Sequence, residues 1–360
     1  MKEFVNDSLD YGDCGRMLAL TSISASAPCR IDMGGTLDIA TLHYPLRSFH
    51  PLTVNLAVDQ RTRVHLSTYT PGHIKVSSRG FDSAGFNADE VPFDHPLGLM
   101  FAVAAYFGAH GIHVRIESPS PPKSGLGGSS VAVVALVAAF ARLGERQGRK
   151  MLTKRQIAML AHAIESAVSM VPCGIQDQLA AVYGGVNAWE WHANGSGSNF
   201  TRRILVKKAN HQRFQQQILL AYSGVQHVSS DINGQWLRRF LSGNDRKAWL
   251  KIIACTRRFA NALAENDIKS AVDAMNEEVD TRRKLTPAVL GKMGEQLVET
   301  SIRSGCGARF TGAGGGGCIW ALGAAERIRA LKPRWGGVLS THPEAQLIEY
   351  SIDHKGVVVG

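Results

Sequence analysis

The chain has 360 residues, of which 44% are hydrophobic and 19% are charged, and its formal net charge is +10. This length and composition allow one large or two medium domains and exclude a disordered or fibrous protein. Because the basic residues are scattered and form no long run, we expect anionic small molecules as partners, such as nucleotides or sugar phosphates, and no nucleic acid.

The six cysteines are widely spaced and form no pair or Cys/His cluster at zinc-binding spacing. This pattern predicts reduced thiols in a cytoplasmic protein. The first twenty residues contain acids and no long apolar core, so we expect no signal peptide. No apolar run looks long enough to span a bilayer, so no membrane association is expected.

Alternating or β-branched sequences predict five strands before residue 120, at 21–27, 53–59, 61–69, 73–77 and 112–118. Residues 1–20 predict a poorly ordered start. A polar loop is expected at 80–92 and a largely apolar helix over 95–108. The first strand runs into a Gly34-Gly35 turn that lies among charged residues.

That turn is bracketed by Arg30, Asp32 and Asp38. One interpretation is a polar pocket edge, where carboxylates accept hydrogen bonds from hydroxyl groups and an arginine steadies anionic charge. The alternative is an ordinary tight turn with a surface ion pair. The residues alone leave both open.

Residues 121–132 contain three glycines, three serines and a lysine directly before the apolar helix expected over 131–142. Such a loop lets the backbone approach a ligand closely, and the helix N-terminus offers free N–H groups to an anion. Ser129 and Ser130 can cap the helix or reach a metal bound to that anion. The segment therefore predicts a nucleotide phosphate site, with a simple linker as the alternative.

A second helix is expected over 153–170, opened by a capping box of Thr153 and Gln156. Glu165 lies toward its C-terminal end, where an acid is unfavourable for the helix dipole and costly to bury. It therefore needs a base or a metal as partner, unless it is a solvated surface acid. Asp177 follows a Pro-Cys-Gly break, at the start of a short helix, where it could merely compensate the helix dipole.

Residues 192–200 are the most linker-like segment, and we place a domain boundary there. Four helices are expected in the second half of the chain, at 229–241, 247–265, 267–284 and 287–304. A glycine-rich run at 305–317 separates the last of them from a strand at 319–322. The remaining elements expected are a strand at 217–222, a helix at 324–331, and strands at 337–340 and 346–352.

Three glycine-rich elements thus accompany two acids, Glu165 and Asp177. Phosphoryl transfer requires a backbone cradle for the phosphates, Mg²⁺ with oxygen ligands, and a carboxylate for the attacking hydroxyl. Ser130 and Glu165 supply suitable oxygens for Mg²⁺, and Asp177 is then free to act on the hydroxyl.

Three segments resemble, in order, the motifs of the GHMP kinases: Ala27–Asp38, Pro122–Ala132 and Arg309–Cys318. The resemblance covers most of the chain. It implies a two-domain α+β kinase with its active site between the domains. The N-terminal domain (1–195) would be ribosomal-S5-like and bind ATP, and the C-terminal domain (196–360) would be ferredoxin-like.

The resemblance also implies roles for single residues. Asp177 would be the catalytic carboxylate, with Arg30 beside it, and Ser130 and Glu165 would hold Mg²⁺. The residues expected to wrap the phosphates of ATP are Lys123, Ser124, Gly125, Leu126, Gly127, Gly128, Ser129 and Ser130. The residues expected to bind the acceptor are Arg30, Gly35, Thr36, Asp38, Cys173, Gly174, Asp177 and Tyr222.

Within the superfamily, residues 173–178, 183–187 and 222–224 are most similar to the D-glycero-D-manno-heptose 7-phosphate kinases and related fucokinases. One departure is Leu37, which stands before Asp38 where that branch usually has Thr. The expected function is phosphorylation of a sugar, at the anomeric hydroxyl of this heptose phosphate. The alternatives are a fucokinase, a galactokinase, a mevalonate-type kinase, or a sensor that binds sugar and ATP without turnover. A monomer and a homodimer both remain open.

Overall fold

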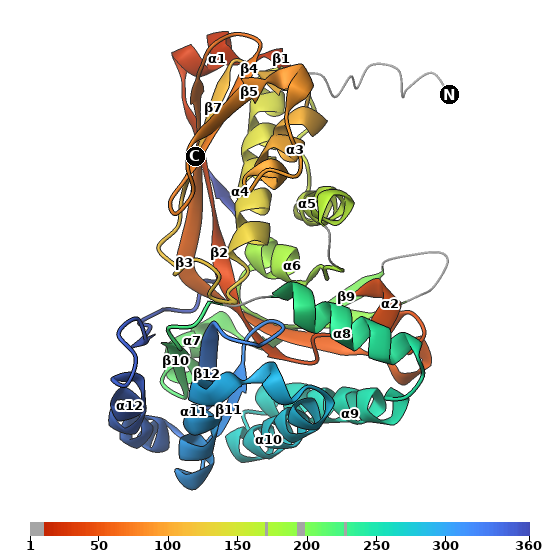
Figure 1. Ribbon diagram of the computed structural model, residues 1–360, viewed down its shortest axis with the longest axis vertical. Coiled ribbons are helices and arrows are strands. Elements are labelled where there is room, and N and C mark those ends of the chain that lie inside the picture. Colours follow the sequence, from red (N-terminus) through yellow and green to blue (C-terminus); the bar gives the residue numbers. More distant parts are fainter. Residues whose placement is uncertain (1–10, 170–171, 193–198, 227–228) are drawn as a thin grey trace.

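The structure is a computed structural model that describes residues 11–169, 172–192, 199–226 and 229–360. Its helices and sheets are mixed without regular alternation, which confirms the expected α+β class. Figure 1 shows a larger sheet with helices on one face in the upper part, and a smaller sheet with further helices in the lower part.

The larger sheet has the strand order β14-β2-β3-β7-β4-β5, and β8 joins it by pairing with both β3 and β9. Its strands are β2 (Ile23–Gly34), β3 (Leu52–Thr68), β4 (His73–Ser78), β5 (Ala84–Asn87), β7 (Ile112–Glu117), β8 (Val186–Trp191), β9 (Phe200–Val206) and β14 (Val358–Val359). A short parallel pair, β1 (Gly12–Asp13) and β6 (Ala109–His110), lies apart from it.

The strands β2 and β3 are long, and the burial pattern of each changes part-way along the strand. In β3, residues 52–58 are all buried, whereas 62–68 alternate between buried and more exposed positions. The fully buried half contacts both α6 and α9, so no face is left for solvent. The strands expected separately at 53–59 and 61–69 are therefore one continuous strand.

Helices α3 (Gly98–Tyr106), α4 (Gly128–Arg146), α5 (Lys154–Val168) and α6 (Gln176–Tyr183) lie together beside the larger sheet (Figure 1). By length and composition α4 is apolar enough to cross a membrane, contrary to the expectation from sequence that no run is long enough. However, 78% of its apolar window is buried inside the protein, as in the core helix of a soluble domain.

The smaller sheet has the antiparallel order β11-β12-β10-β13. Its strands are β10 (Ile218–Tyr222), β11 (Gly307–Phe310), β12 (Cys318–Leu322) and β13 (Gln346–Leu347). The helices that accompany it in the chain are α7 (His211–Gln215), α8 (Ser229–Leu241), α9 (Arg246–Ala264), α10 (Ile268–Leu285), α11 (Gly291–Arg303) and α12 (Ala325–Leu339). Two further short helices, α1 (Gly15–Leu20) and α2 (Ala40–His43), precede β3 in the chain.

The chain returns to the larger sheet at its end, where β14 pairs with β2. The expected division at residue 195 falls between β8 and β9, which pair with each other, so it does not coincide with a sheet boundary. Of the linker expected at 192–200, residues 193–198 lie outside the described residues.

Of residues 337–340, expected as a strand, 337–339 instead belong to α12 and Ser340 is its C-cap. The buried residues Ile328, Leu331, Trp335 and Leu339 follow each other at helical spacing, which defines one apolar stripe. Pro333 and the Gly336-Gly337 pair obscure this stripe in the sequence because they are typical helix breakers.

Of the strand expected at 346–352, only Gln346–Leu347 is a regular strand. The loop expected at 80–92 contains β5.

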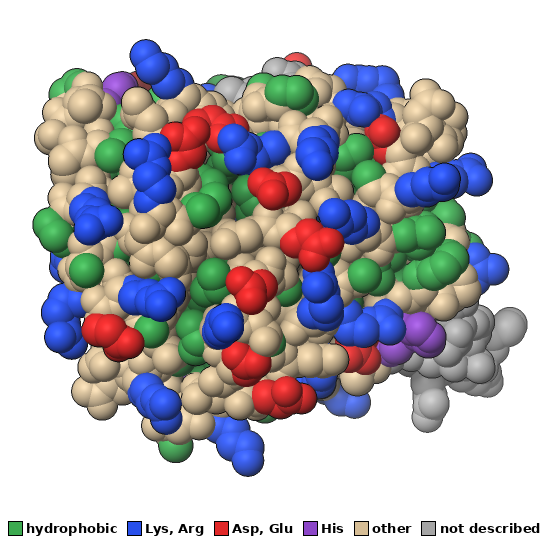
Figure 2. Space-filling view, turned by 90° about the horizontal axis from the view of Figure 1, so that it is seen from below, with side chains coloured by type: hydrophobic (Ala, Val, Ile, Leu, Met, Phe, Trp, Pro, Cys, Tyr) green, Lys and Arg blue, Asp and Glu red, His purple; other side chains and the backbone are tan. Residues whose placement is uncertain are grey.

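The face seen from below carries Lys and Arg interspersed with Asp and Glu (Figure 2). Charged side chains on the helices that accompany the smaller sheet form ion pairs, such as Lys251 with Glu277 and Arg303 with Glu299. Exposed pairs of this kind contribute little stability, although they reduce the local excess of positive charge.

Candidate active site

The glycine-rich loop before α4 has the backbone that a phosphate cradle requires. Gly125 and Gly127 have φ values of 75° and 77°, in the left-handed region that glycine adopts without strain. Gly127 is the N-cap of α4, and the first turn of this helix contains no acidic residue. The N–H groups of that turn therefore point toward the loop with the positive end of the helix dipole behind them.

The glycine run near residue 315 packs directly against this loop. The Cys318 amide donates to the carbonyl of Ser124 at 2.7 Å. A Cβ on Gly125 would lie 3.0 Å from the Thr311 carbonyl oxygen, and one on Gly317 would lie 2.5 Å from that of Ser124. Two motifs almost 190 residues apart thus meet backbone to backbone, and only glycine allows it.

The side chains of Arg30 and Asp177 form a bidentate pair beside the loop. Arg30 Nε donates to Asp177 Oδ1 at 2.7 Å, and Nη2 donates to Oδ2 at 3.0 Å. Arg30 also donates to the Gly125 carbonyl oxygen. Burial opposes its charge, but the carboxylates of Asp177 and Asp32 outweigh this and raise the pKa of Arg30.

Asp177 lies in the first turn of α6 and contacts the loop itself. A Cβ on Gly127 would lie 2.8 Å from Asp177 Oδ2, so the carboxylate is placed directly against the start of α4. Its side chain retains 18% exposure, whereas that of Arg30 retains 6%. The carboxylate is therefore held by its guanidinium partner and still open to a ligand at the loop.

Glu165 of α5 contacts Ser130 of α4 and Gln178 of α6. Ser130 Oγ donates to Glu165 Oε1 at 2.9 Å, and Gln178 Nε2 donates to Oε2 at 2.6 Å. Burial is the main cause that raises the pKa of Glu165 to about 7, and the charge of Asp177 adds to it. The acid is thus not a solvated surface group, which was the alternative left open by the sequence.

The Ser130 and Glu165 oxygens fit Mg²⁺. Octahedral ligands at about 2.0–2.1 Å from the ion lie about 2.9 Å from their neighbours, and these two oxygens are 2.9 Å apart. Among the described residues no group of three or more His, Cys, Asp or Glu side chains could hold a metal. A site with few protein oxygens, completed by phosphates and water, is typical of Mg²⁺.

Asp38, which follows β2 in the chain, contacts the first residue of α6, next to Asp177. The Gln176 amide donates to Asp38 Oδ2, and Gln176 Nε2 donates to Oδ1, both at 3.1 Å. A Cβ on Gly174 would overlap the same carboxylate, so glycine is required there. Burial and then the charge of Asp177 raise the pKa of Asp38 to about 7. The turn after β2 therefore lies at the site and is not a surface ion pair.

Comparison with known proteins finds one family that matches part of the chain. Residues 96–185, which contain the phosphate loop, Glu165 and Asp177, match the GHMP kinases N terminal domain. This segment of the chain is therefore similar to the N-terminal domain of the GHMP kinases.

Similar proteins match most of the chain. A mevalonate kinase of Pyrococcus horikoshii is 24% identical over 324 residues, which cover 83% of this chain and 88% of the relative. A galactokinase of Mycobacterium tuberculosis is 24% identical over 357 residues, with 86% and 91% covered. The solved structure of a D-glycero-D-manno-heptose 1-phosphate kinase from Bacteriodes thetaiotaomicron has a TM-score of 0.71 at 16% identity, covering 94% of this chain and 98% of that one.

The structure brings most of the predicted site residues together, but not all equally. Lys123 and Ser129 are exposed at the rim of the loop. Cys173 is half-buried, and its Sγ lies 3.2 Å from Ser166 Oγ. Tyr222 is buried in β10 opposite Cys318, and within the described chain no hydrogen bond joins it to Asp177 or Asp38.

Several residues that complete the site were not predicted from the sequence. Gln176 and Gln178 flank Asp177 and hold Asp38 and Glu165, respectively. Thr311 Oγ1 accepts the Asp32 amide at 2.8 Å and so joins the third motif to β2. The sequence signal that could have indicated Gln176 and Gln178 is their position in the first turn of a helix that is otherwise largely apolar.

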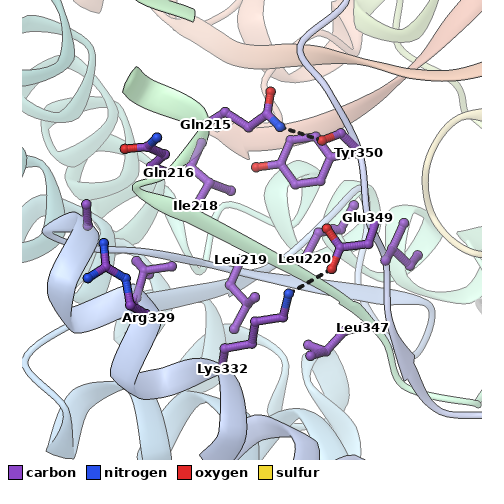
Figure 3. Close-up of a pocket in the computed structure, with 13 residues that line it drawn as sticks. Gln215, Gln216, Ile218, Leu219, Leu220, Arg329, Lys332, Leu347, Glu349 and Tyr350 are labelled. Atoms are coloured by element: carbon purple, nitrogen blue, oxygen red, sulfur yellow. Dashed lines mark hydrogen bonds and ion pairs between the residues drawn. The ribbon is translucent and has the colours of Figure 1, made fainter. Parts of the chain in front are cut away.

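A cavity of about 340 Å³ lies elsewhere, bounded by β10, α12 and residues 347–350 (Figure 3). Lys332 Nζ pairs with Glu349 Oε1 across it at 2.8 Å, and Gln215 Nε2 donates to the Tyr350 carbonyl at 2.7 Å. None of the site residues predicted from the sequence lines it, so this cavity is separate from the candidate active site.

Proposed function

We propose that this protein is a GHMP kinase that transfers the γ-phosphoryl group of ATP to a sugar hydroxyl, and that the acceptor is the anomeric hydroxyl of a heptose 7-phosphate. The observation that carries the proposal is the position of Asp177. Its carboxylate accepts hydrogen bonds from both Nε and Nη2 of Arg30 and lies against Gly127 at the start of α4. A carboxylate at a phosphate cradle is the arrangement needed to act on an attacking hydroxyl.

The chemistry assigns a task to each contact. The loop from Lys123 to Ser130 and the α4 dipole bind the ATP phosphates. Asp177 accepts the proton of the acceptor hydroxyl, whose oxygen then bonds to the γ-phosphorus as the bond to the β–γ bridging oxygen breaks and ADP leaves. Arg30 keeps the Asp177 carboxylate in place. Mg²⁺, held by Ser130 and Glu165, would neutralise charge on the phosphates.

A sugar acceptor is supported by Asp38. Its buried carboxylate, held by Gln176, can accept hydrogen bonds from adjacent hydroxyl groups. The name of the heptose phosphate kinase with a similar fold agrees with this acceptor class. The mevalonate kinase among the relatives supports the second candidate, phosphorylation of mevalonate. ADP release measured with heptose 7-phosphate, fucose, galactose, mannose and mevalonate decides between them.

The role of Asp177 is tested by Asp177→Asn. Asparagine keeps the shape but accepts no proton, so we expect kcat to fall by about 10²–10⁴-fold while ATP still binds. ADP release and ATP binding, measured on the same folded sample, check this. Near-normal turnover in the folded variant would refute the proposed role.

We further propose a cytoplasmic protein that depends on Mg²⁺. No disulfide joins any of the six cysteines, which suits a reducing compartment. The Ser130–Glu165 geometry supports the metal. Removal of Mg²⁺ by a chelator is expected to abolish ADP release.

A further inference from the structure

Four charged side chains are almost fully buried where the smaller sheet meets the turn after β2. Asp32, Arg282 and Arg309 have no exposed surface, and Glu278 has 3%. We call these four residues the buried charge cluster. Two come from α10 and one from β11, whereas Asp32 belongs to β2. The cluster therefore joins the smaller sheet and its helices to the acceptor side of the candidate site.

Arg309 is the centre of the buried charge cluster. Its Nε donates to Glu278 Oε2 at 2.6 Å and its Nη2 to Thr36 Oγ1 at 2.9 Å. Its Nη1 donates to the Asp32 carbonyl at 3.2 Å. Each of its nitrogen atoms has a partner, so the guanidinium is locked, and one edge of it faces the turn.

Arg282 reaches the same turn from α10. It donates to the carbonyl of Gly35, and its Nε donates to Glu278 Oε1 at 3.2 Å. Its guanidinium carbon lies 4.4 Å from the ring centre of Trp236 and 4.9 Å from that of Trp249. The two tryptophan rings and the Glu278 carboxylate thus fix the Arg282 guanidinium, which also donates a hydrogen bond to the backbone of the turn.

The turn needs this support because its backbone is strained. Gly35 and Thr36 have φ values of 85° and 45°, and threonine rarely adopts the left-handed region. Such a conformation persists only where surrounding contacts determine it. Thr36 Oγ1 accepts from Arg309 and donates to Asp32 Oδ2 at 2.6 Å. Two residues later the turn delivers Asp38 to the site.

We propose that Arg282 and Arg309 are positioning residues, which hold the strained turn at Gly35 and Thr36 so that Asp38 faces the acceptor. This inference rests on the proposed function, because Asp38 matters as an acceptor contact. Neither arginine touches the phosphate loop, since Arg309 contacts the turn, β2 and Glu278, and Arg282 contacts the turn, Glu278 and two tryptophans. Their loss should therefore affect acceptor binding more than ATP binding.

The test compares Arg282→Met with Arg283→Met. Arg283 is the next residue of α10, half-buried and paired with Glu295, so the control removes a charge of the same helix without touching the turn. For Arg282→Met we expect the acceptor KM to rise at least tenfold and the ATP KM to stay within twofold. For Arg283→Met both should stay within twofold. Equal changes in both KM values of Arg282→Met would overturn the proposal.

A second pair of variants covers the case in which Arg282→Met does not fold. Thr36→Val removes the hydroxyl between Arg309 and Asp32 but keeps the shape and every charge, whereas Thr36→Ser keeps the hydroxyl. We expect Thr36→Val to raise the acceptor KM selectively and Thr36→Ser to restore it to within about threefold of the wild type. Identical KM values for the two variants would overturn the proposal.

Hydrogen exchange separates this inference from the proposed function. If the wild type releases no ADP with any acceptor, the proposed function fails, but the role of the cluster is still decided by exchange at residues 33–38. Arg282→Met, or Thr36→Val in its place, should speed exchange there at least tenfold and leave α5 unchanged. Unchanged exchange at 33–38 would overturn the inference.

Discussion

Single buried carboxylates define the two sides of the candidate site. Glu165 and Asp38 lie on either side of Asp177, and burial raises the pKa of each to about 7. Such groups lose hydration on folding and regain part of it through the amide and hydroxyl donors that surround them. They cost stability in the empty protein, and ligands with positive charge or hydroxyl donors recover that cost. This is the expected signature of a binding site rather than of a structural core.

Asp38 yields a pH prediction. Its pKa is 3.8 in the unfolded chain and about 7 in the folded protein. Between these values the folded protein keeps a proton that the unfolded chain has lost, so the free energy of unfolding falls as the pH rises, by up to about 1.4 kcal/mol per pH unit. Above pH 7 this contribution levels off.

Asp38→Asn removes this dependence. Denaturant unfolding of both proteins from pH 5 to 8 should show the stability of the wild type falling relative to the variant up to about pH 7. Because Glu165 titrates in both proteins, its effect cancels in the difference. Parallel pH curves would contradict the assignment.

At the scale of elements, the decisive feature is the contact between two glycine-rich loops. The Cys318 amide, at the end of the glycine run, donates a hydrogen bond to the Ser124 carbonyl of the loop before α4, and side chains on the glycines would keep the two segments apart. The phosphate cradle is therefore not a local property of one strand–loop–helix unit. It is completed by a segment from the smaller sheet.

Gly317→Ala tests this contact, with Gly148→Ala as its control. Gly317 and Gly148 have φ values of 79° and 82°, so both variants carry the same backbone strain, about 1–2 kcal/mol. A Cβ on Gly148 meets nothing within 4 Å, whereas one on Gly317 meets the Ser124 carbonyl at 2.5 Å. We expect Gly317→Ala to cost about 1–3 kcal/mol more in denaturant unfolding and to raise the ATP KM. Equal stability of the two variants would refute the contact.

At the scale of the whole molecule, the last ten residues close the chain onto the larger sheet. Asp353 is 8% exposed, pairs with Arg61 of β3, and accepts the Lys355 amide at 2.8 Å. Its own amide donates to the Ala57 carbonyl at 2.9 Å, and its carbonyl accepts from Gly185 at 2.6 Å. The chain segment that contains the smaller sheet is thus tied to the larger sheet both before β10, through β9, and after β13, through the tail.

Asp353→Ala should therefore destabilise the whole molecule. Removing one partner of a buried pair leaves Arg61 without its carboxylate, and we expect a loss of about 3 kcal/mol. Glu349→Ala is the control, because Glu349 and Lys332 form an exposed pair with 85% and 51% exposure. That variant should change the free energy of unfolding by less than about 1 kcal/mol. Denaturant unfolding monitored by tryptophan fluorescence measures both, and equal losses would contradict this role of the tail.

Where the sequence predicted an element wrongly, long-range packing decided the outcome. α12 runs through Pro333 and two glycines because Trp335 is buried and donates to the Leu297 carbonyl at 3.1 Å. β3 continues through residue 60 because it pairs with β2 on both sides of an irregularity at residues 59–60. No local pattern carries either piece of information.

The sequence by itself determined the position of the phosphate loop, and the resemblance of three motifs to the GHMP kinases gave the α+β class. The loop is recognisable because glycines before an apolar helix are a local property of the sequence. It also singled out Glu165 and Asp177, since acids beside apolar or glycine-rich segments need a partner.

Only the tertiary structure decided which groups hold those acids. Gln176 and Gln178 look like surface residues in the sequence, yet α6 turns them inward onto Asp38 and Glu165. Arg282 and Arg309 look like two of many basic residues, yet they are buried and reach the turn beside Asp38. The reason is physical, because most of these hydrogen bonds join residues far apart in the sequence, up to 273 positions for Arg309 and Thr36, and depend on how the two sheets pack, which no local pattern records.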